Sequence, residues 1–593
     1  MEKDARIKAL VLLIVLVYSA FLPLNGVSQE RYLSRKITVS LNSVPVEDAL
    51  ATIGKAGNFT FSYNADIINP DRKITLHADN RHVDDVLTDL FGERVRRKEV
   101  GDHVVLVMNT PRKEQPATKT ECIVTGLVTD AVTGRVLVDA TVYEVGGRRS
   151  ALTHAGGQFS MTFPDGENLR GLSISKQGYR DTVVFIRPVK TKTVMVALSP
   201  RVGAVERIPV QQGEVVAFTA PVPGLTIDSL GVVNFFVPRK LRINSINLNI
   251  FDTWPVQFTL VPFLSTNWKV SGSVNSAFSL NLLVGYTGGV RGFELGGLLN
   301  IDRNHVRGLQ IGGLGNIVGK KTSGLQIGGL FNIDMGHFYG CQLAGLLNWT
   351  TDTVRGAQIA GLMNYVPVRW KGAQIAGLIN ISREHVTGLQ LAGLANIANQ
   401  ENRGVQVAGL LNYTKELKGV QVGVFNISGR VTSGVPVGFF SYVHRGGYMK
   451  FEVSGDEVFY INLAFKTGTK KLYNIFKAGT NDSLLLNFAY GIGTMFDIGK
   501  RLGFNIDFAG SMFFSPVHAM SWYGSQLKLA PAFEFRAARH FAVFLGPAFN
   551  FCFYSDAGEQ AYPKGLPFYN FYDQYHSGTR EQMWIGGVIG FRI

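Results

Sequence analysis

Charged residues are scarce in this chain, since Asp, Glu, Lys and Arg make up only 17% of its 593 residues, against about 25% in typical soluble domains. Cysteine is rarer still. Cys122, Cys341 and Cys552 lie too far apart for a disulfide framework or a clustered metal site, and are most simply small buried side chains. This composition is unusual for a soluble multidomain protein and excludes a disulfide-stapled secreted scaffold.

Long apolar runs and catalytic motifs are missing as well. Beyond the N-terminus no run reaches the ~18 apolar residues of a transmembrane helix, although alternating β-strands can cross a membrane without such a run. The chain contains no HExxH, GxSxG, Walker or CxxC motif, so we expect no enzyme, no metal and no cofactor. The net charge of +15 comes from scattered Lys and Arg without a basic helix or an aromatic–basic motif, so we expect no nucleic-acid partner.

The first 28 residues have the features of a signal peptide. Lys3, Arg6 and Lys8 precede an apolar run over residues 9–22, and a small-residue segment ends at Ser28. A single transmembrane anchor is the alternative, but the apolar run is shorter than the ~20 residues that a span needs. We therefore expect the signal peptide to be removed and the chain to be exported.

Residues 31–108 alternate between strand and helix patterns. A strand beginning at Lys36 leads into PVEDALATIGKAG, in which Val46, Leu50 and Ile53 share one helical face. A second helix, HVDDVLTDLFG, follows the strands FTFSY and KITLHA, and the strands VRRKEV and DHVVLVM close the unit. The pattern predicts a small α+β domain.

The segments SLNSVPVEDAL, NFTFSY, HVDDVLTDLF and HVVLV resemble the short N-terminal domain of secretins and TonB-dependent receptors, called STN. The resemblance implies a periplasmic domain that contacts an inner-membrane regulator of the anti-sigma type through residues 31–108. A generic small α+β domain without a partner is the alternative.

A polar linker over residues 109–120 precedes a second domain at residues 121–198, whose alternating strands and turns predict a small β-sandwich. The segments VTGLVTDAVTGRVLVDATVYEVG, GGQFSMTFPDG and LSISKQGYRDTVV resemble the carboxypeptidase regulatory-like domain, which implies a transthyretin-like sandwich without catalysis. His154 stands where that family usually has Asp, so no ion contact is carried over. Residues 199–250 are irregular and are expected to be a linker.

A sixteen-residue repeat, typified by GLQIGGLFNI at residues 324–333, dominates residues 290–443. Glycines recur from Gly292 to Gly404 at a spacing of sixteen, and Gln and Asn follow them in register. Two or three glycines per repeat, at about 1 kcal/mol each, exclude stable helices. Each repeat is then either one strand and turn of an up-and-down barrel, or one coil of a β-solenoid with stacked Gln and Asn.

Side-chain alternation favours the barrel. On a straight strand Leu325, Ile327, Phe331 and Ile333 share an apolar face, while the opposite face is mostly small or polar. A strand with lipid on one side and a hydrated lumen on the other needs this division over about ten residues. The residues expected to line the lumen are Gln310, Gln326, Gln342, Gln358, Gln374, Gln390, Gln406, Asn316, Asn332, Asn348, Asn364, Asn380, Asn396 and Asn412.

Eight further strands follow the repeats, from YMKFEV at residue 448 to MWIGGVIGFRI at the C-terminus. Together with the repeats they predict a transmembrane barrel of about 20 strands over residues 251–593, with long connections on one side and tight turns such as DIGKR on the other. The chain is thus expected to be mainly β, with a small α+β N-terminal domain, a transthyretin-like β-sandwich and a C-terminal up-and-down barrel. A β-solenoid over residues 290–443 is the alternative fold.

The final strand is similar to the C-terminal signal recognised by the outer-membrane insertion machinery, although it ends in Ile593 rather than in an aromatic residue. Residues 230–593 also resemble uncharacterised outer-membrane proteins of the Bacteroidota. We therefore expect the cell outer membrane as the location, with residues 29–250 in the periplasm. Lipid, lipopolysaccharide and the insertion machinery are the expected partners.

The last outer loop, YPKGLPFYNFYDQYHSG, is rich in aromatic side chains suited to contacting a sugar or a protein at the cell surface. Packing over the barrel mouth or against lipopolysaccharide is the alternative. The expected function is ligand sensing with signal transduction, or solute passage; a structural or adhesive outer-membrane protein is the second hypothesis. The expected surface contacts are Tyr562, Phe568, Tyr569, Phe571, Tyr572 and Tyr575.

Overall fold

The computed structural model describes residues 32–63, 68–92, 95–100, 103–108, 121–164, 170–187, 192–201, 226–248, 253–481, 485–515, 521–555, 570–576 and 578–593. The expected signal peptide and the linker 109–120 lie outside these residues. The chain divides into two compact units, Met1–Gly345 and Leu346–Ile593. Within the described residues, helices are all too short or too polar to cross a membrane.

The N-terminal domain packs two helices against two small sheets around one apolar core. Both helices form where the sequence predicts them, and Val46, Leu50 and Ile53 are buried. β1 pairs antiparallel with β3, and the second sheet has the order β2-β5-β4. The elements are β1 (Lys36–Pro45), α2 (Val46–Gly57), β2 (Thr60–Ser62), β3 (Lys73–His82), α3 (Val83–Phe91), β4 (Val95–Val100) and β5 (His103–Met108).

The second domain is a β-sandwich, as predicted. One sheet has the order β11-β10-β7-β8, the other β12-β6-β9, and alternate side chains of both sheets bury a common core. The strands are β6 (Glu121–Asp130), β7 (Thr141–Glu144), β8 (Ser150–Leu152), β9 (Gln158–Pro164), β10 (Arg170–Ser175), β11 (Thr182–Ile186) and β12 (Lys192–Leu198).

The expected linker at residues 199–250 is partly helical. Its described part contains η3 (Ile227–Ser229), α4 (Gly231–Phe236) and α5 (Arg239–Asn247). Apolar side chains of these helices share one buried cluster with Tyr286 and Ile301 of the strands that follow. This segment is therefore part of the packed structure.

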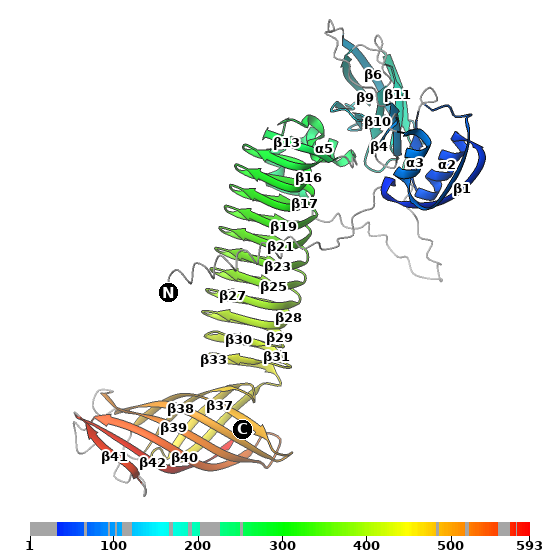
Figure 1. The fold of residues 1–593 in the computed structure, drawn as a ribbon. Helices are drawn as coiled ribbons and strands as arrows, with labels where there is room; N and C mark the ends of the chain where they lie inside the picture. The colour runs from blue at the N-terminus through cyan, green and yellow to red at the C-terminus, as the bar shows by residue number, and fades with distance from the viewer. Residues whose placement is uncertain are drawn as a thin grey trace, which may run out of the picture. The chain divides into compact units, whose positions relative to one another are not determined.

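Residues 253–445 form a β-solenoid whose successive coils pair in parallel within one 21-stranded sheet (Figure 1), and from β18 to β27 a shorter and a longer strand alternate. It begins with β13 (Thr253–Val261), β14 (Leu264–Ser265), η4 (Trp268–Ser273), β15 (Asn275–Asn281) and β16 (Val284–Gly296). The coils continue through β17 (Leu299–Gly312), β18 (Gly315–Val318), β19 (Lys321–Gly328), β20 (Phe331–Asp334), β21 (His337–Ala344), β22 (Leu347–Thr350), β23 (Val354–Ala360), β24 (Met363–Val366), β25 (Trp370–Ala376) and β26 (Ile379–Ser382). The last are β27 (Val386–Ala392), β28 (Ala395–Ala408), β29 (Leu411–Leu417), β30 (Val420–Val422), β31 (Phe425–Val431), β32 (Val435–Val437) and β33 (Phe440–Arg445).

The repeats therefore do not form the barrel that we preferred from the sequence, and the solenoid alternative is the correct one. An up-and-down barrel requires antiparallel neighbours, whereas Gly356 pairs with Gly372 and Gln358 with Gln374 in parallel, sixteen residues apart. The physical reason is a bend at Gly329–Leu330 and its equivalents, which divides each expected ten-residue strand into two shorter ones.

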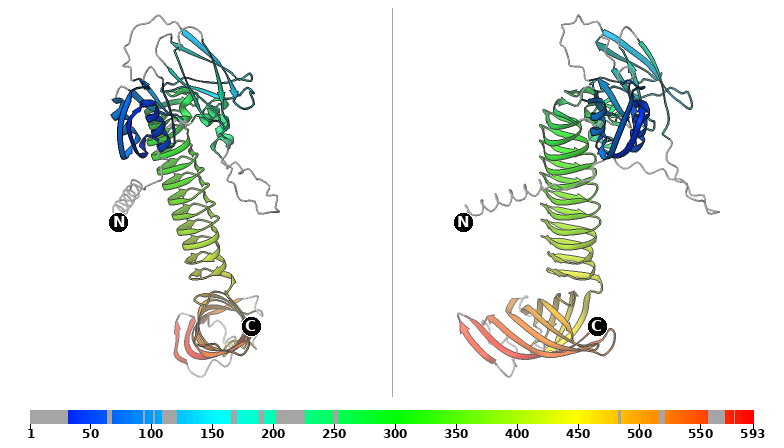
Figure 2. Two further views of the ribbon diagram at one scale, coloured as in Figure 1. Left: turned by 90° about the vertical axis from the view of Figure 1, so that its right-hand side faces the viewer. Right: turned by 45° about the vertical axis from the view of Figure 1, so that its right-hand side comes forward.

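The eight strands predicted after the repeats do form a barrel. They pair antiparallel in sequence order, and β34 pairs with β42 to close the cylinder; β41 adds to the free part of β42. The left-hand view of Figure 2 looks along this barrel. The strands are β34 (Tyr448–Asp456), β35 (Ile461–Gly468), β36 (Tyr473–Thr480), β37 (Leu486–Asp497), β38 (Leu502–Ser515), β39 (Ser521–Arg536), β40 (Ala542–Ser555), β41 (Asn570–His576) and β42 (Thr579–Arg592).

Candidate functional site

The glycine that marks each repeat sits where two coils approach most closely. Gly372 has φ +139°, and a Cβ on it would lie 2.0 Å from the carbonyl oxygen of Gly356. A side chain is excluded there both by the backbone conformation and by the contact with the neighbouring coil. The regular glycine spacing thus records the stacking of coils.

The Asn row forms a ladder inside the solenoid. Asn364 donates one Nδ2 hydrogen bond to Asn380 Oδ1 at 2.9 Å and a second to the carbonyl oxygen of Ile375 at 2.8 Å. Its own Oδ1 accepts from Asn348 at 2.9 Å. The side-chain amide thus uses both N–H donors and its oxygen in hydrogen bonds within the protein, as a buried Asn requires.

The Gln row forms a second ladder, with donors pointing the opposite way along the chain. Gln374 Nε2 donates back to Gln358 Oε1 at 2.8 Å, and Gln390 donates back to Gln374 at 2.7 Å. All fourteen amides that we expected to line a hydrated lumen are fully buried in the solenoid. That expectation is corrected: they bind one another and the backbone.

Three carboxylic acids are buried in the first coils beside these ladders: Glu294, Asp302 and Asp334. Burial raises the pKa of Asp302 well above its ordinary value, and the neighbouring Glu294 raises it further. Burial also raises the pKa of Asp334 to about 7, against hydrogen bonds from Thr322, Gln326 and Gln342 that lower it. Asp302 and Asp334 are therefore held largely in the protonated form at acidic pH.

The outer surface of the solenoid is apolar. Leu362, Leu378, Leu394 and Leu410 stand one per coil at the bend, and between 41% and 47% of each is exposed. The outward positions of the neighbouring strands carry mainly Ile, Val, Leu and Ala. We call the row at the bend the leucine spine; in the second unit it comprises Leu346, Leu362, Leu378, Leu394, Leu410, Val424 and Phe439.

In the second unit the charged residues of the solenoid lie on the edge of the coil away from the leucine spine. From Gly308 onward, the ten residues that start at each repeat glycine contain no Asp, Glu, Lys or Arg as far as residue 443. In the second unit these charges lie after the Asn position of one repeat and before the glycine of the next, partly inside strands, and one follows the last repeat. We call these segments the charged edge; they hold Asp352, Arg355, Arg369, Lys371, Arg383, Glu384, Glu401, Arg403, Lys415, Glu416, Lys418, Arg430 and Arg445.

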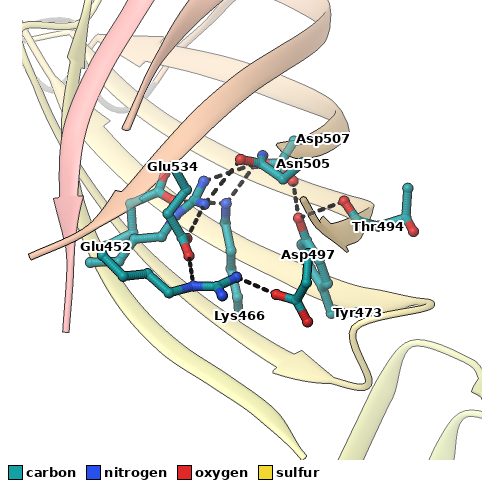
Figure 3. A network of polar contacts seen from close by, with 10 residues as sticks. Glu452, Lys466, Tyr473, Thr494, Asp497, Asn505, Asp507 and Glu534 are labelled. Atoms are coloured by element: carbon teal, nitrogen blue, oxygen red, sulfur yellow. Dashed lines mark hydrogen bonds and ion pairs between the residues drawn. The ribbon is translucent and has the colours of Figure 1, made fainter. Parts of the chain in front are cut away.

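The interior of the barrel contains charged side chains, whereas the core of a soluble domain is mainly apolar. Arg592 is fully buried; its Nε lies 2.8 Å from Glu452 Oε2 and its Nη1 lies 2.8 Å from Glu534 Oε2. Lys466 Nζ lies 2.7 Å from the same Glu452 oxygen and 2.5 Å from Asp507 Oδ2 (Figure 3).

More polar side chains fill the interior around these ion pairs. Tyr473 donates to Asp507 and Asn505 accepts from Arg592. A further buried pair joins Lys528 Nζ to Asp456 Oδ2 at 2.6 Å. Barrels of eight strands have an interior just wide enough for side chains to fill, and these residues occupy it.

The outer wall of the barrel is apolar and exposed. Alternation along each strand brings large side chains outward, among them Phe451, Leu463, Phe488, Phe533 and Leu545, all at least half exposed. Apolar patches this extensive mark a surface that meets lipid or a partner. An apolar outside with a polar inside is the pattern of membrane barrels.

The aromatic loop is only partly described. Tyr562, Phe568 and Tyr569 lie outside the described residues. Phe571 and Tyr575 on β41 are more than half exposed, and the neighbouring Tyr572 is partly buried.

One feature of the sequence indicates the solenoid, although the alternation of apolar and polar residues does not reveal it. On a straight strand Leu330 falls on the same face as Gln326 and Asn332, and an apolar residue recurs at this position in repeat after repeat. A large apolar residue in a polar row indicates that the strand bends there, and in the structure Leu330 is exposed. The ion network of the barrel was missed because its members are far apart in sequence.

Comparisons with protein-family models, with curated proteins and with solved structures give no match to this chain. The function is therefore inferred from the geometry of the barrel and of the solenoid.

Proposed function

We propose that this protein is an outer-membrane anchor that carries a periplasmic sensing scaffold. The barrel holds the chain in the outer membrane, and the two N-terminal domains serve ligand sensing and signal relay in the periplasm. Solute passage, which the sequence left open, is not part of this proposal.

The observation that carries the proposal is the filled barrel. Ion pairs fill the interior of the barrel, and their side chains have little contact with solvent. They join Arg592 to Glu452 and Glu534, and Lys466 to Glu452 and Asp507. A buried ion network of this kind is stable only when each charge keeps its partners. A filled interior of this kind favours an anchor over a channel.

The connections of the barrel support its orientation. Short connections lie at one end of the barrel: residues 498–501 join β37 to β38, and residues 537–541 join β39 to β40. The first residue of β34, Tyr448, and the last residue of β42, Arg592, lie at the same end. The connection from Ser555 to Thr579 belongs to the other end. Outer-membrane barrels have short periplasmic turns and longer external loops, so we assign the tight-turn end and the solenoid side of the chain to the periplasm.

Planar-bilayer recording of the purified full chain tests the anchor against the channel. We expect the protein to insert, with gel mobility that changes on heating, and to give no stepwise conductance. Stable open channels would refute the anchor, and a protein recovered without detergent from the soluble periplasmic fraction would refute the membrane location.

The sensing role rests on the N-terminal domain, whose resemblance to STN implies an inner-membrane partner. Deleting residues 31–108 should abolish a transcriptional response while the heat-modifiable band remains in the outer-membrane fraction. Deleting residues 121–198 is the size-matched comparison, which separates the contribution of the STN-like domain from that of the second domain. An unchanged response after the first deletion would leave the protein as a structural anchor only.

A further inference from the structure

The solenoid presents an apolar surface that nothing in the described chain covers along its length. In the second unit the leucine spine is exposed at each coil, from Leu346 to Phe439. Monomeric soluble proteins rarely expose a contiguous apolar patch of this extent. The surface therefore has an occupant, and the question is its chemistry.

The separation of apolar and basic residues on each coil indicates that the apolar surface contacts lipid. The spine and the outward side chains are apolar, whereas the charged edge of the second unit carries nine Lys or Arg against four Asp or Glu. A surface with an apolar side and a basic rim is what an interfacial protein presents to acyl chains and to anionic head groups. A second protein copy would require no such excess of basic residues at the rim.

The depth of the coil matches one leaflet. Leu378 follows Gly372 by six positions, which at ~3.3 Å per residue sets an upper limit of roughly 20 Å on the depth from the charged edge to the spine. Half of a bilayer's ~30 Å hydrocarbon core is ~15 Å. With the spine among the acyl chains, the Lys and Arg side chains reach the head groups of the same leaflet.

The backbone and the inward side chains also meet the condition for contact with hydrocarbon. Backbone groups pair with the coils on either side in parallel ladders, as between β25 and β27. The inward amides bind each other, as Asn380 binds Asn396. A lipid-facing surface requires that polar groups be satisfied internally, and the backbone pairing and the two ladders do this for the polar groups inside the coil.

The spine ends on the apolar outer wall of the barrel. Phe439 stacks on Tyr490 with ring centroids 4.9 Å apart and meets Phe476 edge-on at 5.3 Å. Tyr490 shares its strand face with Phe488 and Ile492, which are exposed to the outside of the barrel. Tyr490 also donates a hydrogen bond to the carbonyl oxygen of Gly438 at 3.1 Å.

A hollow of about 680 Å³ lies beside this contact on the outer wall, lined by Phe451, Leu463, Phe476 and Phe488 among others. The apolar surface of the solenoid is therefore continuous with the wall that the barrel turns toward lipid. This continuity is the second observation that identifies the occupant.

We infer that the solenoid is embedded in the periplasmic leaflet of the outer membrane, with its leucine spine among the acyl chains and its charged edge at the head groups. It is thus a membrane-embedded element in its own right. The inference deepens the proposed function, because the leaflet is defined by the barrel.

Site-directed spin labelling of the full chain in anionic phospholipid vesicles tests the inference. The three native cysteines are buried, so the label can be attached at introduced positions, with the labelled parent as background. Leu362→Cys, Leu378→Cys and Leu394→Cys report on the spine, and Arg383→Cys reports on the charged edge. Leu545→Cys on the outer wall of the barrel is the reference for lipid contact.

We expect the three spine labels to collide with oxygen at least threefold more often than with a water-soluble nickel complex, as at Leu545. The Arg383 label should show the opposite preference. The three spine values should agree with one another, because every coil has the same depth.

Three outcomes would overturn the inference, and they are distinguishable. Nickel access at the spine with lipid contact at Leu545 would leave the anchor intact and place the solenoid in water. Low access to both reagents together with dipolar broadening between labels would show that a second copy covers the spine. Nickel access at Leu545 as well would refute the anchor and the embedded solenoid together.

Discussion

Asparagine and glutamine differ by one methylene, and the two ladders of the solenoid use each at its own position of the coil. The Asn next to the bend reaches both the next Asn and a main-chain carbonyl, as Asn364 reaches Asn380 and Ile375. Gln374 stands in the long strand, where its longer side chain spans the gap to Gln358 in the preceding coil. Because the donors of the two ladders point in opposite directions, their amide dipoles oppose one another along the stack.

Asn364→Ala should therefore lower the free energy of unfolding by about 2–4 kcal/mol, since it leaves buried partners on Asn348, Ile375 and Asn380 unsatisfied. Denaturant unfolding in detergent, followed by circular dichroism, measures the change. Asn399→Ala, at a partly exposed position, is the matched control and should cost less than about 0.5 kcal/mol. Equal losses at both positions would show that the ladder contributes nothing specific.

The buried acid Asp334 should make stability depend on pH. Its pKa is about 7 in the folded chain, above the ~3.9 of an unfolded Asp, so the folded state retains a proton that the unfolded state has lost. This stabilisation is complete below pH ~4 and is lost as the pH rises toward 7, at up to about 1.4 kcal/mol per pH unit.

Asp334→Asn should remove that dependence, so that its stability relative to the parent increases from pH 4 to pH 7 and then levels off. Thermal unfolding across this range measures the effect. Ser382→Asn changes the equivalent position of a later coil without removing a carboxylate, and its difference from the parent should stay constant with pH. A constant difference for Asp334→Asn would contradict the assignment of the titrating group.

At the scale of elements, the barrel and the solenoid both place polar residues inside and apolar residues outside, by different means. The solenoid satisfies its interior through neutral amides that repeat every coil. The barrel does so through ions from separate strands, with Arg592 of β42 joining Glu452 of β34 and Glu534 of β39. Removal of a single charged side chain should therefore destabilise several strands at once.

Arg592→Met should destabilise the barrel by about 3–5 kcal/mol, because Glu452 and Glu534 then lose a buried counter-ion. The temperature at which the folded gel band converts to the unfolded one should fall. Arg501→Met, at an exposed position in the tight turn before β38, is the control and should leave that temperature within error of the parent. An unchanged transition for Arg592→Met would show that the network does not stabilise the barrel.

At the scale of the whole molecule, the proposals place the two ends of the barrel in different compartments. In intact cells a membrane-impermeant maleimide should label Gln574→Cys on β41. It should label Gly499→Cys in the tight turn only after the outer membrane is permeabilised. The native cysteines are buried, so the parent protein gives the background, and the reverse pattern would invert the assigned orientation.

Much of the local structure was predictable because it depends on near neighbours. Helices α2 and α3, the strands of the sandwich and the eight barrel strands follow from periodicity and turn residues alone. The inward position of Gln326 and Asn332 and the outward position of Leu325 and Ile333 also follow from alternation. The aromatic loop was noted, but only Phe571, Tyr572 and Tyr575 fall in the described chain.

The sequence by itself determined which side chains share a face, because a strand alternates with period two whatever its partner. It did not determine the partner. A barrel strand with an apolar outside and a solenoid coil with a polar inside give the same alternation, so GLQIGGLFNI suits either. The choice was made by the bend at Gly329–Leu330 and by the parallel pairing of each repeat with the next. Those contacts join residues sixteen apart, and the ion network of the barrel joins residues as much as 140 apart; only the tertiary structure brings them together.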